Sequence, residues 1–482
     1  MADFNDAYPE YGETSKLDEL RATQYSYLDE RGHVYLDYTG AGLAARSQLE
    51  AHAGRIGAGC FGNPHSENPT SAASTELVEQ ARTAVLRHFG TTAEDYAVIF
   101  TPNATGACRL VGEAYPFRRR TRLVLTADNH NSVNGLREFA RARGARVAYV
   151  PMTAPELRVR GADVHRALSR GEGARPGLFA YPAQSNFSGV QHPLQWVRAA
   201  RDAGYDVLLD AAAYVPANRL DLSEVRPEFV AVSWYKVFGY PTGVGALLVR
   251  RDALSRLRRP WFSGGTIWGV SVQGGWHRLL EDEGAFEDGT LNFLSIPDVT
   301  VGLGWVDAIG TDLIHQRVSM LTGWMLERLR MLKHSNGAPL VRLHGPADMT
   351  ARGGTISLSF LDRAGQVIDE RAVARDAAAA RISLRTGCFC NPGAGEWAFG
   401  LSRKDVRGPW WLALAGGGLL RRHMTTVDQY LQAIGLTYGG AVRVSFGLAS
   451  NVADVEAFLD FAERTYRDRG ADLAGLAPRL RC

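Results

Sequence analysis

The chain has 482 residues, of which 45% are hydrophobic and 22% charged, an ordinary globular composition with room for two or three domains. Its formal net charge of +3 is small for this length, so a general nucleic-acid-binding surface is not expected. No apolar stretch reaches the roughly 18 residues of a membrane span, and no secretory signal follows Met1. The scattered cysteines do not predict a disulfide framework or a metal site, because the pair Cys388 and Cys390 has no second ligand pair. These features predict a soluble, cytoplasmic protein without membrane or nucleic-acid partners.

Apolar runs typical of strands alternate with amphipathic runs typical of helices from about residue 35 to 300. The expected strands are Tyr96–Phe100, Arg122–Leu125, Arg146–Tyr149, Gly177–Tyr181, Asp206–Leu209, Phe229–Val232 and Ala246–Val249. The expected helices include Ser74–His88, Val133–Arg143 and Leu194–Ala203. Alternation of this kind predicts an α/β fold with a mostly parallel sheet covered on both faces.

A second α/β section follows. A helical pattern over about 300–332 leads to apolar alternation at Thr355–Phe360 and Val442–Phe446, and then to a helix at about Val452–Arg467. We therefore expect a large domain at 33–300 and a smaller α/β domain formed by 1–32 and 301–482. The N-terminal segment is polar and is expected to be partly ordered, whereas the last dozen residues are expected to form a loose tail.

Polar or reactive side chains follow the ends of most expected strands. In chain order they are Ala104 and Thr105, His130, Gln184 and Asn186, Asp210, and Ser233 with Lys236. Each has an ordinary explanation when taken alone, such as a helix cap, a structural histidine, turn amides or a lysine whose ammonium reaches solvent along its stem. Ligands of such sheets bind at the carboxyl ends of the strands, where these side chains are expected to meet.

This combination matches the requirements of pyridoxal 5'-phosphate. A lysine amine forms a Schiff base with the aldehyde, an aspartate keeps the pyridine nitrogen protonated, an imidazole stacks on the ring and an amide binds the ring hydroxyl. Free N–H groups and a hydroxyl at a helix start suit the phosphate. Burial lowers the pKa of a lysine and makes its amine nucleophilic. The sequence thus predicts a pyridoxal phosphate enzyme centred on Lys236.

Nine motifs extend this prediction along nearly the whole chain. They are YLDYTGAGL (35–43), FGNPHSENPTS (61–71), DNHNSV (128–133), PAQSNFSG (182–189), LLDAAAYV (208–215), SWYKVFGYPTGVGALLVR (233–250), RTGCFCNPGA (385–394), GLSRKDVR (400–407) and VRVSFGLAS (442–450). With them the chain resembles the class V aminotransferase group, of pyridoxal phosphate fold type I, which includes the cysteine desulfurases. It is most similar to the sulfurase domain of molybdenum cofactor sulfurases.

The resemblance implies a role for each candidate residue. It makes Lys236 the Schiff-base lysine and Asp210 the partner of the pyridine nitrogen. It places the remaining cofactor contacts at His130 over the ring, at Asn186 near the ring hydroxyl, and at Thr105, Ser233 and the Ala104 N–H around the phosphate. Gln184 is a further candidate cofactor-binding residue. In related dimers a Gly-Thr pair of the second subunit reaches the phosphate, so Thr290 implies a homodimer. Arg443, which alone would suggest a surface ion pair, would bind the carboxylate of an amino-acid substrate.

Cys390 is the residue on which the predicted reaction depends. In RTGCFC it matches the cysteine that attacks the sulfur of bound cysteine in desulfurases, which implies alanine and a Cys390 persulfide as products. Lys236 would move protons, and His130 could assist the departing thiol as an acid. Two buried cysteines acting as small apolar residues are the structural alternative. Cys388 is assigned no catalytic role.

Departures from the family pattern leave other functions open. Ala213 and Tyr235 replace residues typical of simple desulfurases, and Gly395 stands where the sulfurases have a further cysteine. The sequence as it stands is also expected to be without the C-terminal domain of full-length sulfurases, which leaves the sulfur acceptor open. One alternative is β-elimination, decarboxylation or transamination, which uses Lys236 without Cys390. Another is a non-catalytic binding protein, against which the intact cofactor set argues. Trp397, Trp410 and Trp411 would either shape a bulkier substrate pocket or serve packing alone.

Overall fold

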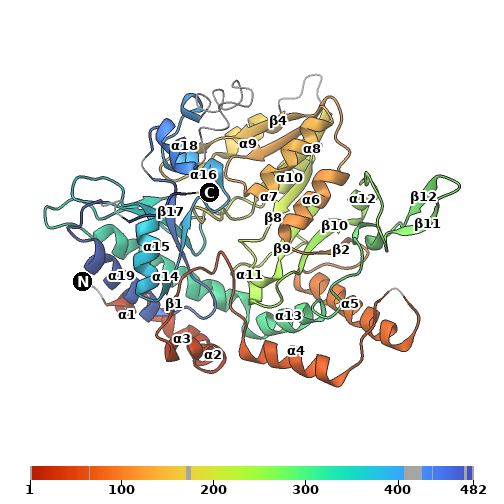
Figure 1. The fold of residues 1–482 in the computed structure, drawn as a ribbon, viewed down its shortest axis with the longest axis horizontal. Helices are drawn as coiled ribbons and strands as arrows, with labels where there is room; N and C mark the ends of the chain where they lie inside the picture. The colour runs from red at the N-terminus through yellow and green to blue at the C-terminus, as the bar shows by residue number, and fades with distance from the viewer. Residues whose placement is uncertain are drawn as a thin grey trace.

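A seven-stranded sheet forms the centre of the computed structural model, which describes residues 3–64, 66–169, 175–406, 426–436, 438–471 and 475–479 (Figure 1). From one edge to the other the strands are β2 (Tyr96–Thr101), β10 (Gly245–Arg250), β9 (Phe229–Ser233), β8 (Asp206–Asp210), β7 (Arg175–Pro182), β3 (Thr121–Thr126) and β4 (Arg146–Val150). Only β10 runs antiparallel to its neighbours, so the prediction of a mostly parallel sheet is confirmed.

Helices cover both faces of this sheet because its strands are apolar on both sides. In β9, for example, Val230 and Val232 pack into one hydrophobic cluster, whereas Phe229 and Ala231 pack into the other. The face of Phe229 is covered by α6 (Ala104–Ala114), α7 (Asn131–Asn134), α8 (Leu136–Ala142) and α12 (Arg251–Leu254). The face of Val230 is covered by α5 (Pro69–His88), α9 (Gly161–Ser169), α10 (Trp196–Asp202) and α13 (Pro297–Ile309). The near-continuous apolar runs in the sequence are the expected signature of such doubly covered strands.

Asparagine caps set the starts of several helices. The Asn68 side chain accepts a hydrogen bond from the Ser71 N–H, and Pro69 occupies the first turn of α5. In the same way Asn103 caps α6, directly after β2. Capping at this point turns the chain at the carboxyl edge of the sheet and leaves the first turn of α6 beside the end of β9 and the start of β10.

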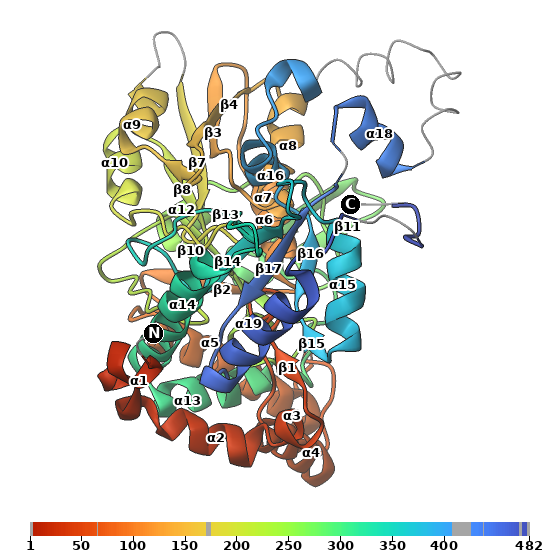
Figure 2. The same ribbon diagram turned by 90° about the vertical axis from the view of Figure 1, so that its left-hand side faces the viewer.

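A four-stranded antiparallel sheet lies beside the large one (Figure 2). Its order is β13 (Val341–His344), β14 (Thr355–Phe360), β17 (Ala441–Ser445) and β16 (Arg385–Gly387). The described residues of this part of the chain form the helices α14 (Thr311–Met331), α15 (Glu370–Ala379), α16 (Pro392–Ala398), α18 (Val427–Ala433) and α19 (Val452–Tyr466). The strands and helices expected from the sequence for this second α/β section are therefore present.

The N-terminal segment is more ordered than the sequence suggested. It forms α1 (Phe4–Ala7), α2 (Lys16–Gln24) and α3 (Tyr27–Glu30), followed by β1 (Val34–Tyr35), which pairs in parallel with β15 (Ile382–Ser383), and by α4 (Arg46–Ala58). Some of its polar residues make hydrogen bonds and ion pairs with distant parts of the chain. The fully buried Arg317 of α14 binds Thr14 and Asp18, and Arg21 binds Asp454 at 2.6 Å. Because those partners come from the far end of the chain, local sequence does not reveal them.

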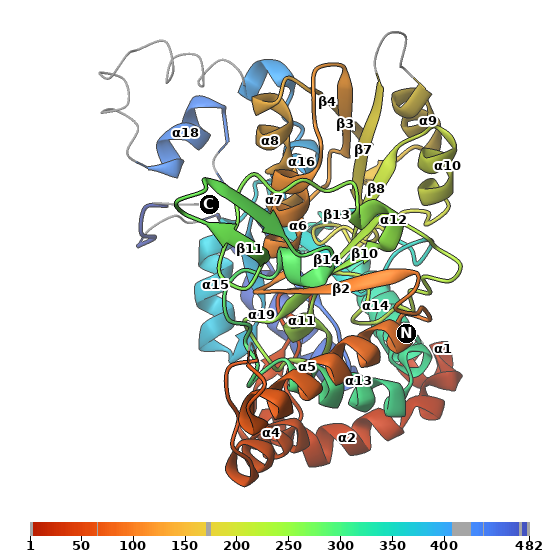
Figure 3. The same ribbon diagram turned by 90° about the vertical axis from the view of Figure 1, so that its right-hand side faces the viewer.

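Two short hairpins were not predicted. One joins β5 (Met152–Thr153) to β6 (Arg158–Val159), and the other joins β11 (Ile267–Ser271) to β12 (Trp276–Leu279). The second hairpin projects from the body of the molecule (Figures 1 and 3). It carries exposed apolar side chains, among them Trp268 at 66% and Val272 at 95% exposure.

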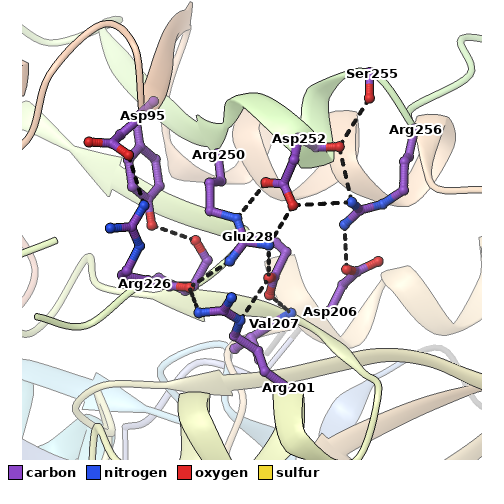
Figure 4. Close-up of polar contacts among 12 residues, drawn as sticks. Asp95, Arg201, Asp206, Val207, Arg226, Glu228, Arg250, Asp252, Ser255 and Arg256 are labelled. Carbon is purple, nitrogen blue, oxygen red and sulfur yellow. Dashed lines mark hydrogen bonds and ion pairs between the residues drawn. The ribbon is translucent and has the colours of Figure 1, made fainter. Parts of the chain in front are cut away.

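An ion-pair network lies at the end of the large sheet opposite to the carboxyl ends of its parallel strands (Figure 4). At its centre Glu228 is 2% exposed, accepts the Val207 N–H at 2.7 Å and pairs with Arg250 at 2.8 Å and Arg201 at 3.4 Å. Burial raises the pKa of Glu228 and the arginines oppose this effect. The carboxylate is satisfied on every side that the structure shows, so we assign this cluster a structural role.

No helix in the described part of the chain is long and apolar enough to cross a membrane. Trp410 and Trp411, for which the sequence offered a pocket or a packing role, lie outside the described residues. The domain boundaries at residues 33 and 300 remain a prediction.

Candidate functional site

A cavity of about 330 Å³ opens at the carboxyl ends of the parallel strands. It collects most of the side chains that the sequence singled out: Ala104, Thr105, His130, Gln184, Asn186, Asp210, Ser233 and Lys236 all line it. Ser132, Tyr235 and Ala213 line it as well. Arg443, Cys390 and Thr290 are not part of this lining. The convergence of residues from five strand ends is the arrangement expected of a ligand site in an open α/β sheet.

Lys236 lines the cavity from the five-residue helix α11 (Trp234–Phe238), which follows β9 directly. Gly239 ends this helix at φ +80°, and a Cβ at that position would fall 2.2 Å from the Ala44 nitrogen, so the turn requires glycine. Burial lowers the pKa of Lys236, and the attraction of Asp210 opposes the shift. A lysine held in this way has a larger neutral fraction, which is the nucleophilic form.

Asp210 ends β8, beside β9 in the sheet. Its residue is 9% exposed, and its Oδ1 accepts the Ala212 N–H at 3.0 Å. No arginine or lysine is paired with it among the described residues. A buried carboxylate facing a cavity without an ion-pair partner suits a cationic ligand group.

Small donors gather at the start of α6. The Ala104 N–H donates to Ser233 Oγ at 3.0 Å, and Thr105 Oγ1 lies 2.7 Å from Ser132 Oγ. Gly245 of β10 lets this strand pack closely against the start of α6, because a Cβ there would lie 2.7 Å from the Asn103 Cα. Hydroxyls and main-chain N–H groups at the start of an eleven-residue helix form a suitable cradle for a phosphate.

His130 caps α7 on the wall of the cavity. Its Nδ1 accepts the Ser132 N–H at 3.1 Å and lies 2.9 Å from Ser132 Oγ. Burial lowers the pKa of His130, and the positive charges of Lys236 and Arg443 act in the same direction, whereas Asp210 opposes them. The imidazole is therefore favoured in its neutral form.

The segment that carries Cys390 is fixed to the cavity wall through Asn186. Asn186 Nδ2 donates to the Phe389 carbonyl at 2.8 Å, and its Oδ1 accepts from Asn391 Nδ2 at 2.9 Å. Asn391 is fully buried and also donates to the Asp128 carbonyl at 2.7 Å. Phe389 and Cys390 have φ values of 54° and 52°, a conformation that side chains rarely adopt.

Cys390 itself carries an exposed free thiol. Its carbonyl accepts the Asn131 N–H at 2.7 Å, so its backbone adjoins the helix that His130 caps. Cys388 is disulfide-bonded and offers no thiol. The structure therefore presents one of the two cysteines of RTGCFC to solvent at the border of the site, and the interpretation of both as buried apolar residues is wrong.

Arg443 lies on β17, buried to 2% exposure. It donates to Asp37 Oδ1 at 3.0 Å and to the Asn186 carbonyl at 3.0 Å, and its Nε has no partner among the described residues. Asp37 is shared with Arg385, at 2.6 Å, and Arg385 is half exposed. Sequence reasoning missed Asp37 as a functional residue although it belongs to the motif YLDYTGAGL. The predicted Arg443 is thus buried near the site, but an internal carboxylate holds it.

Thr290 lies beside a neighbouring cavity of about 300 Å³. That cavity shares Pro102 and Gly243 with the first, and Thr290 Oγ1 accepts from Asn63 at 3.2 Å. Within one chain Thr290 therefore lines a separate cavity from that of Lys236, and its role at the site of a second subunit stays a prediction.

The residues present fit pyridoxal 5'-phosphate. A lysine with a lowered pKa, an unpaired buried aspartate, an imidazole wall and a cradle of N–H and hydroxyl groups line one cavity of suitable size. Among the described residues no cluster of histidine, cysteine or acidic side chains suits a metal ion. Together these groups suit an aromatic ligand that carries an aldehyde and a phosphate.

Comparison with known proteins agrees with this site. The family model described as aminotransferase class-V matches residues 34–458. The chain belongs to the class V aminotransferase family. Molybdenum cofactor sulfurase of Homo sapiens is 37% identical over 472 residues, 94% of this chain and 51% of that protein. Its counterpart of Arabidopsis thaliana is 33% identical over 502 residues, 96% of this chain and 59% of that protein.

Solved structures show the fold. An apo cysteine desulfurase of Thermococcus onnurineus NA1 matches with a TM-score of 0.75 at 22% identity, covering 93% of this chain and 98% of that chain. The cysteine desulfurase CsdA of Escherichia coli matches with a TM-score of 0.70 at 19% identity, with the same coverage. The predicted resemblance and the fold type I architecture are confirmed. The chain spans about half to three fifths of the length of the curated relatives described above.

Proposed function

We propose that this chain is a pyridoxal phosphate-dependent enzyme that cleaves the carbon–sulfur bond of L-cysteine or a cysteine derivative and passes the sulfur to Cys390. The observation that carries the proposal is the combination of a lysine with a lowered pKa in a cavity that fits the cofactor and an exposed free thiol on a segment bonded to the same cavity wall. Family membership and the similarity to molybdenum cofactor sulfurases support it.

The cofactor, when bound, supplies an electron sink that acidifies the α-carbon of an amino acid. Lys236 Nζ would hold the cofactor and then accept and return the α-proton, for which its lowered pKa is suited. Asp210 would face the pyridine nitrogen, and the start of α6 with Thr105 and Ser233 the phosphate. Arg443 would orient the substrate carboxylate once that carboxylate takes the place of Asp37 as its partner. Gln184 and Asn186 complete the polar wall.

Sulfur transfer would proceed by attack of the Cys390 thiolate on the sulfur of the substrate. The S–S bond forms as the bond between that sulfur and the β-carbon breaks, and the electron pair of the broken bond passes to the carbon fragment. Protonation of this fragment yields alanine, and Cys390 becomes a persulfide. A later acceptor thiol or group would regenerate Cys390. Exposure of the Cys390 thiol suits this handover.

Two variants test the proposal with L-cysteine as substrate. Lys236→Ala is expected to abolish the visible absorbance of the bound cofactor together with turnover. Cys390→Ser is expected to keep the absorbance but to lose alanine formation at least a hundredfold, and the matched control Cys60→Ser, another exposed free thiol, to retain it. Mass analysis should find the additional sulfur on Cys390. Full turnover of Cys390→Ser would contradict the proposal.

The second candidate is lyase, decarboxylase or transaminase chemistry at Lys236 alone. The similarity to molybdenum cofactor sulfurases does not favour it. Formation of pyruvate, an amine or a keto acid in the Cys390→Ser variant would select it.

The assembly, compartment and domain division are part of the same proposal. We expect a homodimer in which Thr290 of one subunit approaches the phosphate of the other, a cytoplasmic location, and a small-molecule amino-acid substrate with a separate sulfur acceptor. We also retain the division into a domain at 33–300 and a second formed by 1–32 and 301–482. Sedimentation of wild type and Thr290→Ala with and without cofactor tests the first point.

A further inference from the structure

The hydrogen bonds around His130 limit what its imidazole can do. A main-chain N–H can only donate, so the 3.1 Å contact from the Ser132 N–H requires an unprotonated Nδ1. Ser132 Oγ lies 2.9 Å from the same nitrogen and supplies a second donor. The proton of a neutral imidazole must then be on Nε2, the nitrogen left for the cavity that His130 lines.

A doubly protonated ring does not fit this arrangement. Placing a proton on Nδ1 would set it against the Ser132 N–H, and the cap of α7 would have to break. The charged groups that act electrostatically on the ring are Asp210 from β8, Lys236 from α11 and Arg443 from β17. Two of these three are positive, and burial of the ring also disfavours a charged imidazole.

We propose that Ser132 is a positioning residue that holds His130 as the neutral imidazole with its proton on Nε2. His130 then donates a hydrogen bond from Nε2 and does not transfer protons during the reaction. The proposal rests on the proposed function and refines it: proton transfer is left to Lys236 Nζ, and the acid role expected of His130 from the sequence is replaced by polarisation of the departing sulfur or the ring.

The hydroxyl of Ser132 connects this arrangement to the helix start. Ser132 Oγ lies 2.7 Å from Thr105 Oγ1, so the two hydroxyls and the imidazole form one hydrogen-bonded row. Removal of the hydroxyl would leave the main-chain N–H as the single donor to Nδ1. Loss of one neutral hydrogen bond to the uncharged form should therefore make protonation easier.

The test is nitrogen-15 NMR of the full chain labelled at histidine, without added cofactor and again with pyridoxal 5'-phosphate. His130→Gln identifies the signals of His130. Wild type should show the Nε2–H tautomer from pH 6 to 8. In Ser132→Ala the ratio of protonated to neutral His130 at a fixed pH should rise about fivefold, the effect of one hydrogen bond. Ser132→Thr, which retains a hydroxyl, should restore the wild-type ratio, and the exposed control Ser169→Ala should not change it.

A wild-type His130 with a proton on Nδ1 at pH 7 would overturn the proposal, as would a change of less than twofold in Ser132→Ala. These spectra do not depend on turnover. If L-cysteine yields no alanine but the spectra are as expected, only the proposed function fails. If turnover occurs, the acid limb of the kcat profile should move to higher pH in Ser132→Ala, because the neutral imidazole is then lost at a higher pH.

Discussion

Replacement of Asp37 by asparagine tests how the site holds its buried arginine. The change keeps the size of the side chain and removes its charge. In the structure the Asp37 side chain is 11% exposed and pairs with Arg443, whose side chain is 2% exposed, and with Arg385, whose side chain is 49% exposed. Removal of one member of a buried pair leaves an uncompensated charge and typically costs about 3–5 kcal/mol. We expect a loss of that size in the free energy of unfolding.

Urea denaturation of the cofactor-free protein measures this loss, and the chain offers two controls. Arg385→Gln removes the half-exposed partner of the same carboxylate and should cost about 0–1 kcal/mol. Asp460→Asn removes a carboxylate that is 65% exposed and paired with Arg464, and should cost a similarly small amount. If Asp37→Asn lost no more than Asp460→Asn, the reasoning that Asp37 compensates Arg443 would be wrong.

Two further predictions concern the Cys390 segment and the lysine. Asn391→Asp places a carboxylate oxygen 2.9 Å from Asn186 Oδ1, where two acceptors face each other without a proton. The Cys390 segment should therefore detach from Asn186, and alanine formation should fall at least tenfold, while the absorbance of the bound cofactor persists. Unchanged turnover would contradict this. Lys236→Met should raise the free energy of unfolding of the cofactor-free protein by about 1–2 kcal/mol at neutral pH, whereas the exposed control Lys333→Met should not. Because the pKa of Lys236 is lowered in the folded state, the unfolded chain binds more protons, so the gain should be present at neutral pH and vanish as the pH rises past the unfolded pKa of about 10.4.

The large sheet was predictable because its strands are apolar on both faces. The expected strand Phe229–Val232 differs from β9 by one residue, and Ala246–Val249 differs from β10 by one at each end. Because ligands of parallel sheets bind at the carboxyl ends of the strands, Lys236, Asp210 and His130 were expected to lie together, and they line one cavity. The hairpin of β11 and β12 was not predicted, because these two strands pair with each other and bury little apolar surface against the rest of the described chain.

The contacts that tune the site were not predictable, because they join distant parts of the chain. Asp37 and Arg443 are 406 residues apart, and Arg443 meets the Asn186 carbonyl across 257 residues. A motif identifies such residues but does not say which of them bind each other. The arginine expected to be ready for a substrate carboxylate proved to be paired already.

Asn186 shows how closely the cofactor wall and the sulfur-carrying segment are joined. The sequence predicted that its amide binds the ring hydroxyl of the cofactor. In the structure its Nδ2 donates to the Phe389 carbonyl and its Oδ1 accepts from Asn391, so each end of the amide is engaged by the segment that contains Cys390. An amide nitrogen has two protons, and only one is used by Phe389. The second proton can therefore serve the ring hydroxyl without release of the segment, and one side chain then aligns the site of bond cleavage with the thiol proposed to receive the sulfur.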